Sequence, residues 1–98
     1  MTIESKNDSG KLTMLITGRL DTTTAPDLET AIKERLEGVT QLILDFGKLE
    51  YISSAGLRVL LSTQKIMNKK GLMKLINVNS EIMDIFEITG FNDILTIE

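Results

Sequence analysis

Two short apolar segments, separated by a stretch that favours a helix, constrain the fold of this chain more than any other feature. The segments are "QLILDF" at residues 41–46 and "LMKLIN" at residues 72–77, and neither shows a regular alternation of apolar and polar residues. Strands covered on both faces have this composition, as in a parallel sheet flanked by helices. Residues 55–70 between them are rich in helix formers. The order of strand, helix and strand predicts a right-handed βαβ unit.

The first part of the chain predicts a β-hairpin. We expect an edge strand over residues 2–7, followed by the turn-forming sequence "NDSG" at residues 7–10. After the turn, Leu12, Met14 and Ile16 recur at every second position, as in a strand that buries mainly one face. The hairpin therefore precedes the βαβ unit along the chain.

Boundary signals place two further helices. Thr24 is expected to cap the first of them, and Gly38 is expected to close it. Ser80 is expected to cap the other, which covers residues 81–89 and is followed by a short strand at residues 93–97.

Together these elements predict one α/β domain over residues 1–98. An opening β-hairpin is followed by βαβ units, so that a small mixed sheet forms, and three or more helices pack on it. A chain of 98 residues is long enough to bury one core of this kind.

The residue types exclude several classes of activity. The chain contains no histidine and no cysteine, so it cannot form a Ser-His-Asp triad, a Cys-His pair or a histidine metal site. It also has neither the spacing of a calcium loop nor a glycine-rich phosphate loop with lysine. We therefore expect no enzymatic activity, no catalytic residue, no metal site and no cofactor.

Charge and apolar patterning restrict the partners and the location. A net charge of −3 and only four aromatic residues make direct nucleic-acid binding unfavourable. No apolar run is long enough to cross a membrane, and no secretory signal precedes the first strand. Together with the absence of cysteine, these features predict a cytoplasmic protein without membrane insertion.

The segment "YISSAGLRVLL" at residues 51–61 holds two adjacent serines between apolar stretches. The simpler interpretation, slightly favoured by the residues alone, is that a serine caps the helix that follows, which is worth about 1 kcal/mol. The alternative is a phosphorylation site, because Ser54 follows a strand at the end of the sheet where sites form. A phosphate there would face free N–H groups and the positive end of the helix dipole. Gly56 lowers helix propensity but would let the backbone of another protein approach closely.

The helix over residues 55–70 has an unusually wide apolar surface. When it is projected at 100° per residue, one narrow polar stripe contains Arg58, Ser62, Lys65 and Lys69. The apolar arc is wider than a surface helix needs. The pattern favours a deeply packed helix. The alternative is an exposed edge near Leu57 and Leu61 that contacts a partner.

Three segments of the chain match, in order, the pattern of one known family. "GRLDTTTAPDLETAI" at residues 18–32 is similar to its Gly-x-Leu-Asp segment and the helix that follows. "LILDFGKLEYISSAGLRVLL" at residues 42–61 resembles its signature, in which a buried strand leads to Ser-Ser/Ala-Gly-Leu at the start of a helix. "GLMKLINVNSEIMDIFEITGFNDIL" at residues 71–95 resembles its closing strand, helix and strand. On these segments the chain resembles a STAS domain, the fold of bacterial anti-sigma factor antagonists.

This resemblance implies regulation by partner switching. In the family, an unphosphorylated antagonist binds an anti-sigma factor that is a serine kinase, and so releases a sigma factor. Phosphorylation by that kinase ends the interaction, and a PP2C-type phosphatase restores it. By motif match the phosphoacceptor is Ser54. The family often has aspartate at the preceding position, where this chain has Ser53, and Ser53 is therefore a rival acceptor.

The resemblance also implies a partner-binding surface around the phosphoacceptor. Asp21 matches an aspartate that the family places beside the serine loop. We expect the surface to comprise Asp21, Thr22, Thr23, Ile52, Ser53, Ala55, Gly56, Leu57, Arg58 and Leu61. Two other functions remain alternatives: an unphosphorylated STAS scaffold subunit of a transporter or other signalling complex, and a small enzyme or ligand-binding protein.

Overall fold

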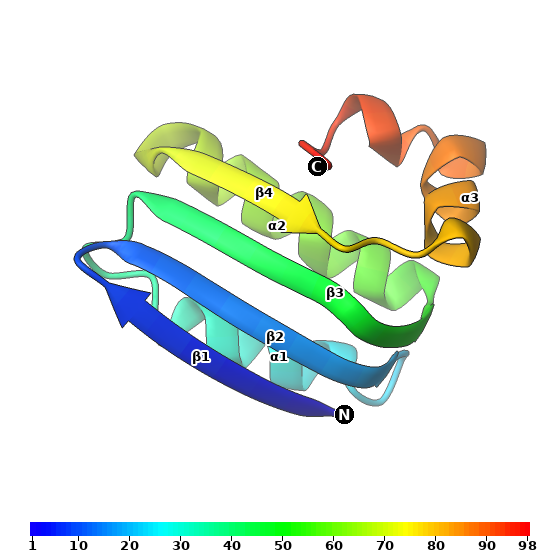
Figure 1. Ribbon diagram of the computed structural model, residues 1–98, viewed down its shortest axis with the longest axis horizontal. Coiled ribbons are helices and arrows are strands. Elements are labelled where there is room, and N and C mark those ends of the chain that lie inside the picture. The colour runs from blue at the N-terminus through cyan, green and yellow to red at the C-terminus, as the bar shows by residue number, and fades with distance from the viewer.

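The computed structural model describes residues 1–98 and has a four-stranded sheet at its centre (Figure 1). β1 (Thr2–Asp8) pairs antiparallel with β2 (Lys11–Leu20). β2, β3 (Gln41–Ile52) and β4 (Leu72–Ile76) are parallel, and the strand order is β1-β2-β3-β4. The predicted hairpin, the mixed sheet and the α/β class are thus confirmed.

The two helices that connect the parallel strands cover the same face of the sheet. α1 (Ala25–Lys33) and α2 (Ser54–Lys70) lie behind the sheet in Figure 1. α3 (Ser80–Thr89) lies to one side of the sheet, toward the start of α2 (Figure 1). No helix covers the front face of the sheet in this view, so the expectation that the parallel strands are covered on both faces is wrong.

Ile43 shows why the sequence of β3 nevertheless lacks alternation. It belongs to the face without helices, yet it is only 7% exposed. In the strand register it lies between Thr13 of β2 and Lys74 of β4. The ammonium of Lys74 lies 2.8 Å from a carboxylate oxygen of Glu98, and lysine alkyl chains held in this way commonly cover apolar surface. Neighbouring side chains, rather than a second helical layer, therefore bury this isoleucine.

β3 is longer than predicted because it contains two bulges. Between the pairs Leu15–Asp45 and Thr17–Lys48, β3 advances one residue more than β2, and the same happens between Gly18–Leu49 and Arg19–Tyr51. Each bulge leaves one residue unpaired and bends the strand. Burial consequently recurs at every third position, and this part of the strand, residues 47–52, escaped prediction because strands are recognised by a period of two.

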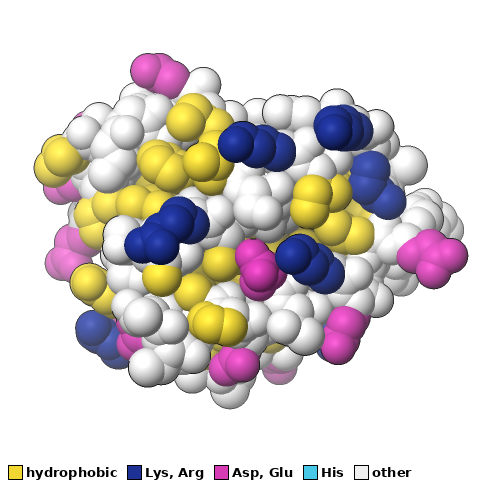
Figure 2. Space-filling model, turned by 180° about the vertical axis from the view of Figure 1, so that it is seen from behind, with side chains coloured by type: hydrophobic (Ala, Val, Ile, Leu, Met, Phe, Trp, Pro, Cys, Tyr) yellow, Lys and Arg dark blue, Asp and Glu magenta, His cyan; other side chains and the backbone are white.

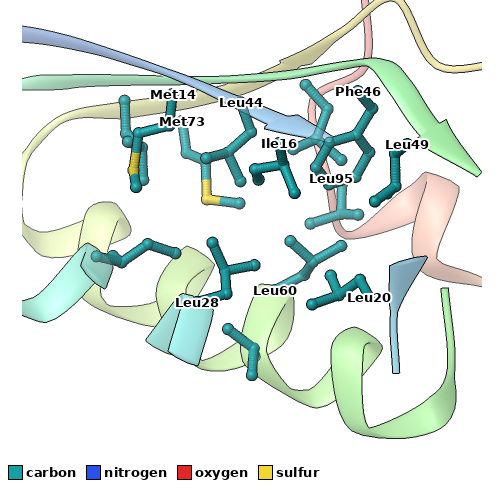
Figure 3. Packing of buried hydrophobic residues seen from close by; sticks show 14 of the residues in the cluster. Met14, Ile16, Leu20, Leu28, Leu44, Phe46, Leu49, Leu60, Met73 and Leu95 are labelled. Carbon is teal, nitrogen blue, oxygen red and sulfur yellow. The ribbon is translucent and has the colours of Figure 1, made fainter. Parts of the chain in front are cut away.

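The core lies between the sheet and the helices. Its side chains form one cluster of 23 buried hydrophobic residues. In Figure 3, Leu28 of α1 and Leu60 of α2 face strand residues such as Met14, Ile16 and Leu44. All five are at most 2% exposed. The prediction that α2 is a deeply packed helix is confirmed at Val59, Leu60 and Met67, which are all buried.

The helix ends differ from the prediction in three places. α1 ends at Lys33, with Glu34 as its C-cap, so Gly38 does not close it but lies in the following turn with φ of 76°. Thr24 is the residue before α1, but its side chain makes no cap bond to the helix. Asn79, not Ser80, caps α3, because its side-chain oxygen accepts a hydrogen bond from the Ile82 N–H.

The predicted strand at residues 93–97 is wrong. A 3₁₀ helix, η1 (Phe91–Asp93), is followed by a single parallel bridge between Leu75 and Ile97. Leu95 is buried in the core between these two features, which accounts for the apolar pattern that suggested a strand. None of the helices has the length and apolar character needed to span a bilayer.

Candidate functional site

The ends of β2 and β3 bring together two segments that are about thirty residues apart in sequence. Leu20 pairs with Ile52 at the last position of both strands. The Ser53 N–H donates to the Leu20 carbonyl oxygen at 2.8 Å and extends this pairing by one residue. The loop that begins at Asp21 therefore lies beside the start of α2, as expected for the carboxyl ends of parallel strands.

Ser53 is the N-cap of α2. Its backbone is extended, with φ of −99° and ψ of 175°, and its hydroxyl accepts a hydrogen bond from the Gly56 N–H at 3.4 Å. Its carbonyl oxygen accepts the first helical bond, from the Leu57 N–H at 2.9 Å. The capping role that the sequence assigned to either serine thus belongs to Ser53.

Ser54 is the first residue of α2 and is exposed. Its hydroxyl takes no part in capping. The Ser54 oxygen accepts one long hydrogen bond, from Arg58 Nη2 at 3.4 Å, one helical turn further along α2. The hydroxyl group of Ser54 is therefore accessible from solvent and lies beside a guanidinium group.

Gly56 is required by the packing of this chain. A Cβ atom at this position would lie 2.8 Å from Leu20 Cγ and 2.9 Å from Ile52 Cγ1, both closer than van der Waals contact allows. Because Gly56 is itself buried, no backbone of another protein can reach it directly. The expectation that this glycine opens the surface to a partner is wrong; it lets α2 start against the ends of β2 and β3.

The loop after β2 is organised by the carboxylate of Asp21. Its Oδ1 atom accepts hydrogen bonds from the Thr23 hydroxyl at 2.7 Å, the Thr23 N–H at 3.0 Å and the Thr24 N–H at 3.1 Å. The hydroxyl bond of Thr23 is the largest cause that lowers the pKa of Asp21 below 3.8, whereas partial desolvation acts in the opposite direction. Asp21 is thus a fixed negative charge beside the start of α2.

Arg19 and Tyr51 form an exposed pair beside this loop that the sequence did not reveal. The Arg19 guanidinium carbon lies 4.3 Å from the centre of the Tyr51 ring, a cation–π arrangement. Arg19 Nε is also 3.9 Å from Asp21 Oδ2. The two residues become neighbours only through the second bulge of β3, which no sequence pattern indicated.

The expected partner-binding residues divide into exposed and buried groups. Thr22, Thr23 and Arg58 are exposed, and Ala55 and Leu61 are half-buried. Ile52 and Leu57 are only 3% and 8% exposed and belong to the core, so they support this surface from below and offer little contact area. The surface formed by Thr22, Thr23, Ser54, Ala55, Arg58 and Leu61 is called the serine surface below.

The surface depressions of the molecule are lined by residues other than those of the serine surface. A shallow depression of about 680 Å³ lies between the bulged part of β3 and the start of α3, away from the Ser54 hydroxyl, and Lys48 is its only cation. No group of three or more aspartate or glutamate side chains is placed to hold a metal ion.

Figure 2 shows the face formed by the helices, on which hydrophobic side chains gather in patches interrupted by lysines and arginines.

Comparisons with known proteins agree with this geometry. The family model of the STAS domain matches residues 2–98. The chain is similar to BtrV of Bordetella bronchiseptica, described as a candidate anti-sigma factor antagonist, with 33% identity over 90 residues that make up 90% of this chain and 78% of BtrV. It is also similar to the anti-sigma-B factor antagonist of Bacillus subtilis, with 29% identity over 96 residues, which cover 97% of this chain and 88% of that protein.

The fold is also found in a solved structure. The anti-sigma factor antagonist SpoIIAA in its unphosphorylated form superposes with a TM-score of 0.84 at 17% identity, covering 99% of this chain and 88% of SpoIIAA. The phosphorylated form of SpoIIAA superposes with a TM-score of 0.77. At this level of identity the likeness concerns the fold.

Proposed function

Because the chain belongs to the STAS domain family, we propose that it is an anti-sigma factor antagonist that acts by partner switching. Its unphosphorylated form binds an anti-sigma factor that is a serine kinase, and a sigma factor is released. The kinase transfers the γ-phosphoryl group of ATP to the Ser54 oxygen, which gives up its proton while ADP leaves, and binding ends. A PP2C-type phosphatase restores the binding form. The names of BtrV and of the Bacillus subtilis relative support the antagonist role.

The exposed hydroxyl of Ser54 is the observation that carries this proposal. Ser53 supplies the cap of α2, so the Ser54 oxygen can be modified without loss of the bonds that start the helix. A phosphate at the first position of a helix also lies close to N–H groups without intrahelical partners, and the helix dipole favours its charge. That SpoIIAA is known in a phosphorylated form supports the compatibility of this fold with the modification.

Ser53 is the weaker acceptor on the same grounds. Its oxygen is occupied by the Gly56 N–H, and its side chain is half-buried. A phosphate on this oxygen would have to fit into the half-buried space where the hydroxyl now contacts the first turn of α2. The family's aspartate at this position would cap α2 equally well, because serine and aspartate are similarly good N-caps. The difference from the family pattern therefore leaves the start of the helix intact.

A phosphate on Ser54 can end binding without refolding the domain. It adds about −1.5 to −2 charges to a surface whose neighbouring loop already carries the ionised Asp21. A partner that packs on the serine surface would have to desolvate this charge or meet it with its own carboxylates. A loss of about 3 kcal/mol is enough to weaken binding more than a hundredfold.

Ser54→Asp tests this function when it and the unchanged chain are titrated with an anti-sigma factor kinase from the same organism. We expect at least a tenfold rise in Kd, because the carboxylate adds one charge to the serine surface. Thermal unfolding should change little, since Ser54 is exposed. Isothermal titration calorimetry and thermal melts give the two quantities. Asn68→Asp, which adds the same charge at an exposed position nearly four turns further along α2, is the matched control and should bind nearly as the unchanged chain does.

Incubation with the kinase and ATP tests the acceptor itself. We expect a mass gain of one phosphate that is retained in Ser53→Ala and lost in Ser54→Ala. Equal binding by the unchanged chain and Ser54→Asp would contradict the switch. Stable co-purification with a transporter ATPase and no phosphorylation would instead favour the scaffold function.

A further inference from the structure

Arg58 is an exposed cation of α2 without an anionic partner. No carboxylate lies within 4.0 Å of its guanidinium, whereas Lys33, Arg35 and Lys74 each form an ion pair. The only side-chain group that its guanidinium bonds is the Ser54 hydroxyl, at 3.4 Å. Its charge is therefore directed toward an atom that is neutral in the unmodified chain.

The spacing of the two residues suits an ion pair once that atom carries a phosphate. Residues four apart on a helix lie on the same face, one turn from each other. Phosphate oxygens would lie further out than the serine oxygen, so the guanidinium reaches them by side-chain rotation alone. Arginine binds phosphate through two parallel N–H···O bonds, which gives this pair geometric specificity as well as charge.

The other arginine near the site is already engaged. Arg19 lies over the Tyr51 ring and close to the Asp21 carboxylate. Moving it to a phosphate on Ser54 would break both contacts. Arg58 has no such contact to lose.

We propose that Arg58 is the intramolecular counter-ion of the phosphate on Ser54; this rests on the proposed function for the presence of the phosphate. The pair holds the phosphate against the first turn of α2. Phosphorylation then changes two groups of the serine surface at once: it adds the phosphate, and it engages the guanidinium of Arg58, which is then no longer free to bind a partner. Both groups, on Ser54 and Arg58, lie within one turn of α2.

The test uses the full chain with phosphoserine incorporated at position 54 during translation, and follows the second ionisation of the phosphate by ³¹P NMR. A neighbouring cation favours the dianion, so the midpoint should lie lower in the unchanged chain than in Arg58→Gln, by about 0.5 pH. Arg58→Lys should recover part of this difference, because lysine keeps the charge but not the two parallel bonds.

Lys65→Gln is the matched control, since it removes the same charge from the same polar stripe. It lies eleven residues from Ser54, roughly 16 Å along the helix axis, which is beyond the Debye length of about 8 Å at 0.15 M salt. The phosphate on Ser54 should therefore ionise with the same midpoint in Lys65→Gln as in the unchanged chain. If Arg58→Gln and Lys65→Gln give the same midpoint, the pairing is overturned.

The outcome is independent of the proposed partner switch. Because translation installs the phosphoserine, the NMR result needs neither a kinase nor a binding partner. Failure of the kinase to modify Ser54 would refute the proposed function and leave the pairing standing. An unchanged midpoint in Arg58→Gln would refute the pairing and leave the function standing.

Discussion

Ser53 and Ser54 are adjacent, yet their hydroxyl groups serve different purposes. The first is turned toward the backbone of α2 and accepts the Gly56 N–H, whereas the second faces solvent beside Arg58. The step from extended to helical backbone between the two residues separates them, because only the N-cap has its side chain in reach of the first turn. One position thus builds the helix, and the next is free for regulation.

Gly56→Ala should destabilise the domain, although alanine is the better helix former. Its Cβ would meet Leu20 and Ile52 at less than 3.0 Å. Overpacking of this kind costs roughly 1–3 kcal/mol, of which about 1 kcal/mol is offset by helix propensity. We expect a net loss of up to about 2 kcal/mol in urea unfolding. Lys65→Ala, exposed on the same helix, should change stability by less than about 0.5 kcal/mol. A gain in stability for Gly56→Ala would show that Leu20 and Ile52 shift enough to make room for the added Cβ atom.

Asp21 predicts a pH dependence at the same site. Its pKa is lower in the folded chain, chiefly because the Thr23 hydroxyl donates to it. Such a carboxyl stabilises the fold above its unfolded pKa, about 3.9, and this contribution is lost as the pH falls through the folded pKa. The carboxyl NMR titration should have a midpoint below 3.8. Thr23→Val should raise the midpoint; the same midpoint in both chains would mean that this hydroxyl bond has no influence on the carboxylate.

At the scale of elements, the start of α2 depends on its cap and on the strand that leads to it. Ser53 follows the last residue of β3 directly, so that no loop separates strand and helix. The direct connection places the cap at the edge of the sheet. The orientation of the serine surface is therefore set by two regular elements, which hold a site more firmly than a loop does.

Ser53→Ala should cost about 1 kcal/mol of unfolding free energy, because the Gly56 N–H loses its acceptor. Ser53→Asp, which restores the residue type that the family often has here, should stay within a few tenths of the unchanged chain. Urea denaturation monitored by circular dichroism measures both. If aspartate proves as costly as alanine, the hydroxyl bond to Gly56 is not what stabilises this helix start.

The sequence predicted these elements well where periodicity was regular and poorly where it was not. The hairpin, α2 and the parallel strands follow from alternation, helix formers and apolar runs. The second half of β3 did not, because its bulges replace a period of two by a period of three. Within the site, the serine motif indicated Ser54 as the phosphoacceptor, which stays a prediction, and helical projection alone could not show that Leu57 is buried. That depends on α1 and the sheet, which pack on α2 in three dimensions.

At the scale of the whole molecule, buried residues of the core support the serine surface from below. Leu20, Ile52 and Leu57 lie directly beneath the surface and are buried. The sheet and the two helices behind it pack on each other through one buried cluster (Figure 1). A change of charge on Ser54 can therefore alter association while the packing of the domain stays the same.

The two bulges of β3 also determine which of its residues face the core. Up to Phe46 the residues of the strand that belong to the core are even-numbered; after the first extra residue the core residue is the odd-numbered Leu49, and after the second it is Ile52, even-numbered again. Each bulge absorbs one extra residue, so that Leu49 stays opposite Gly18 and Ile52 stays opposite Leu20, both on the core side. Loss of one residue at a bulge would therefore straighten the strand there and leave Ile52 opposite Leu20, with Ser54 on the same surface as before.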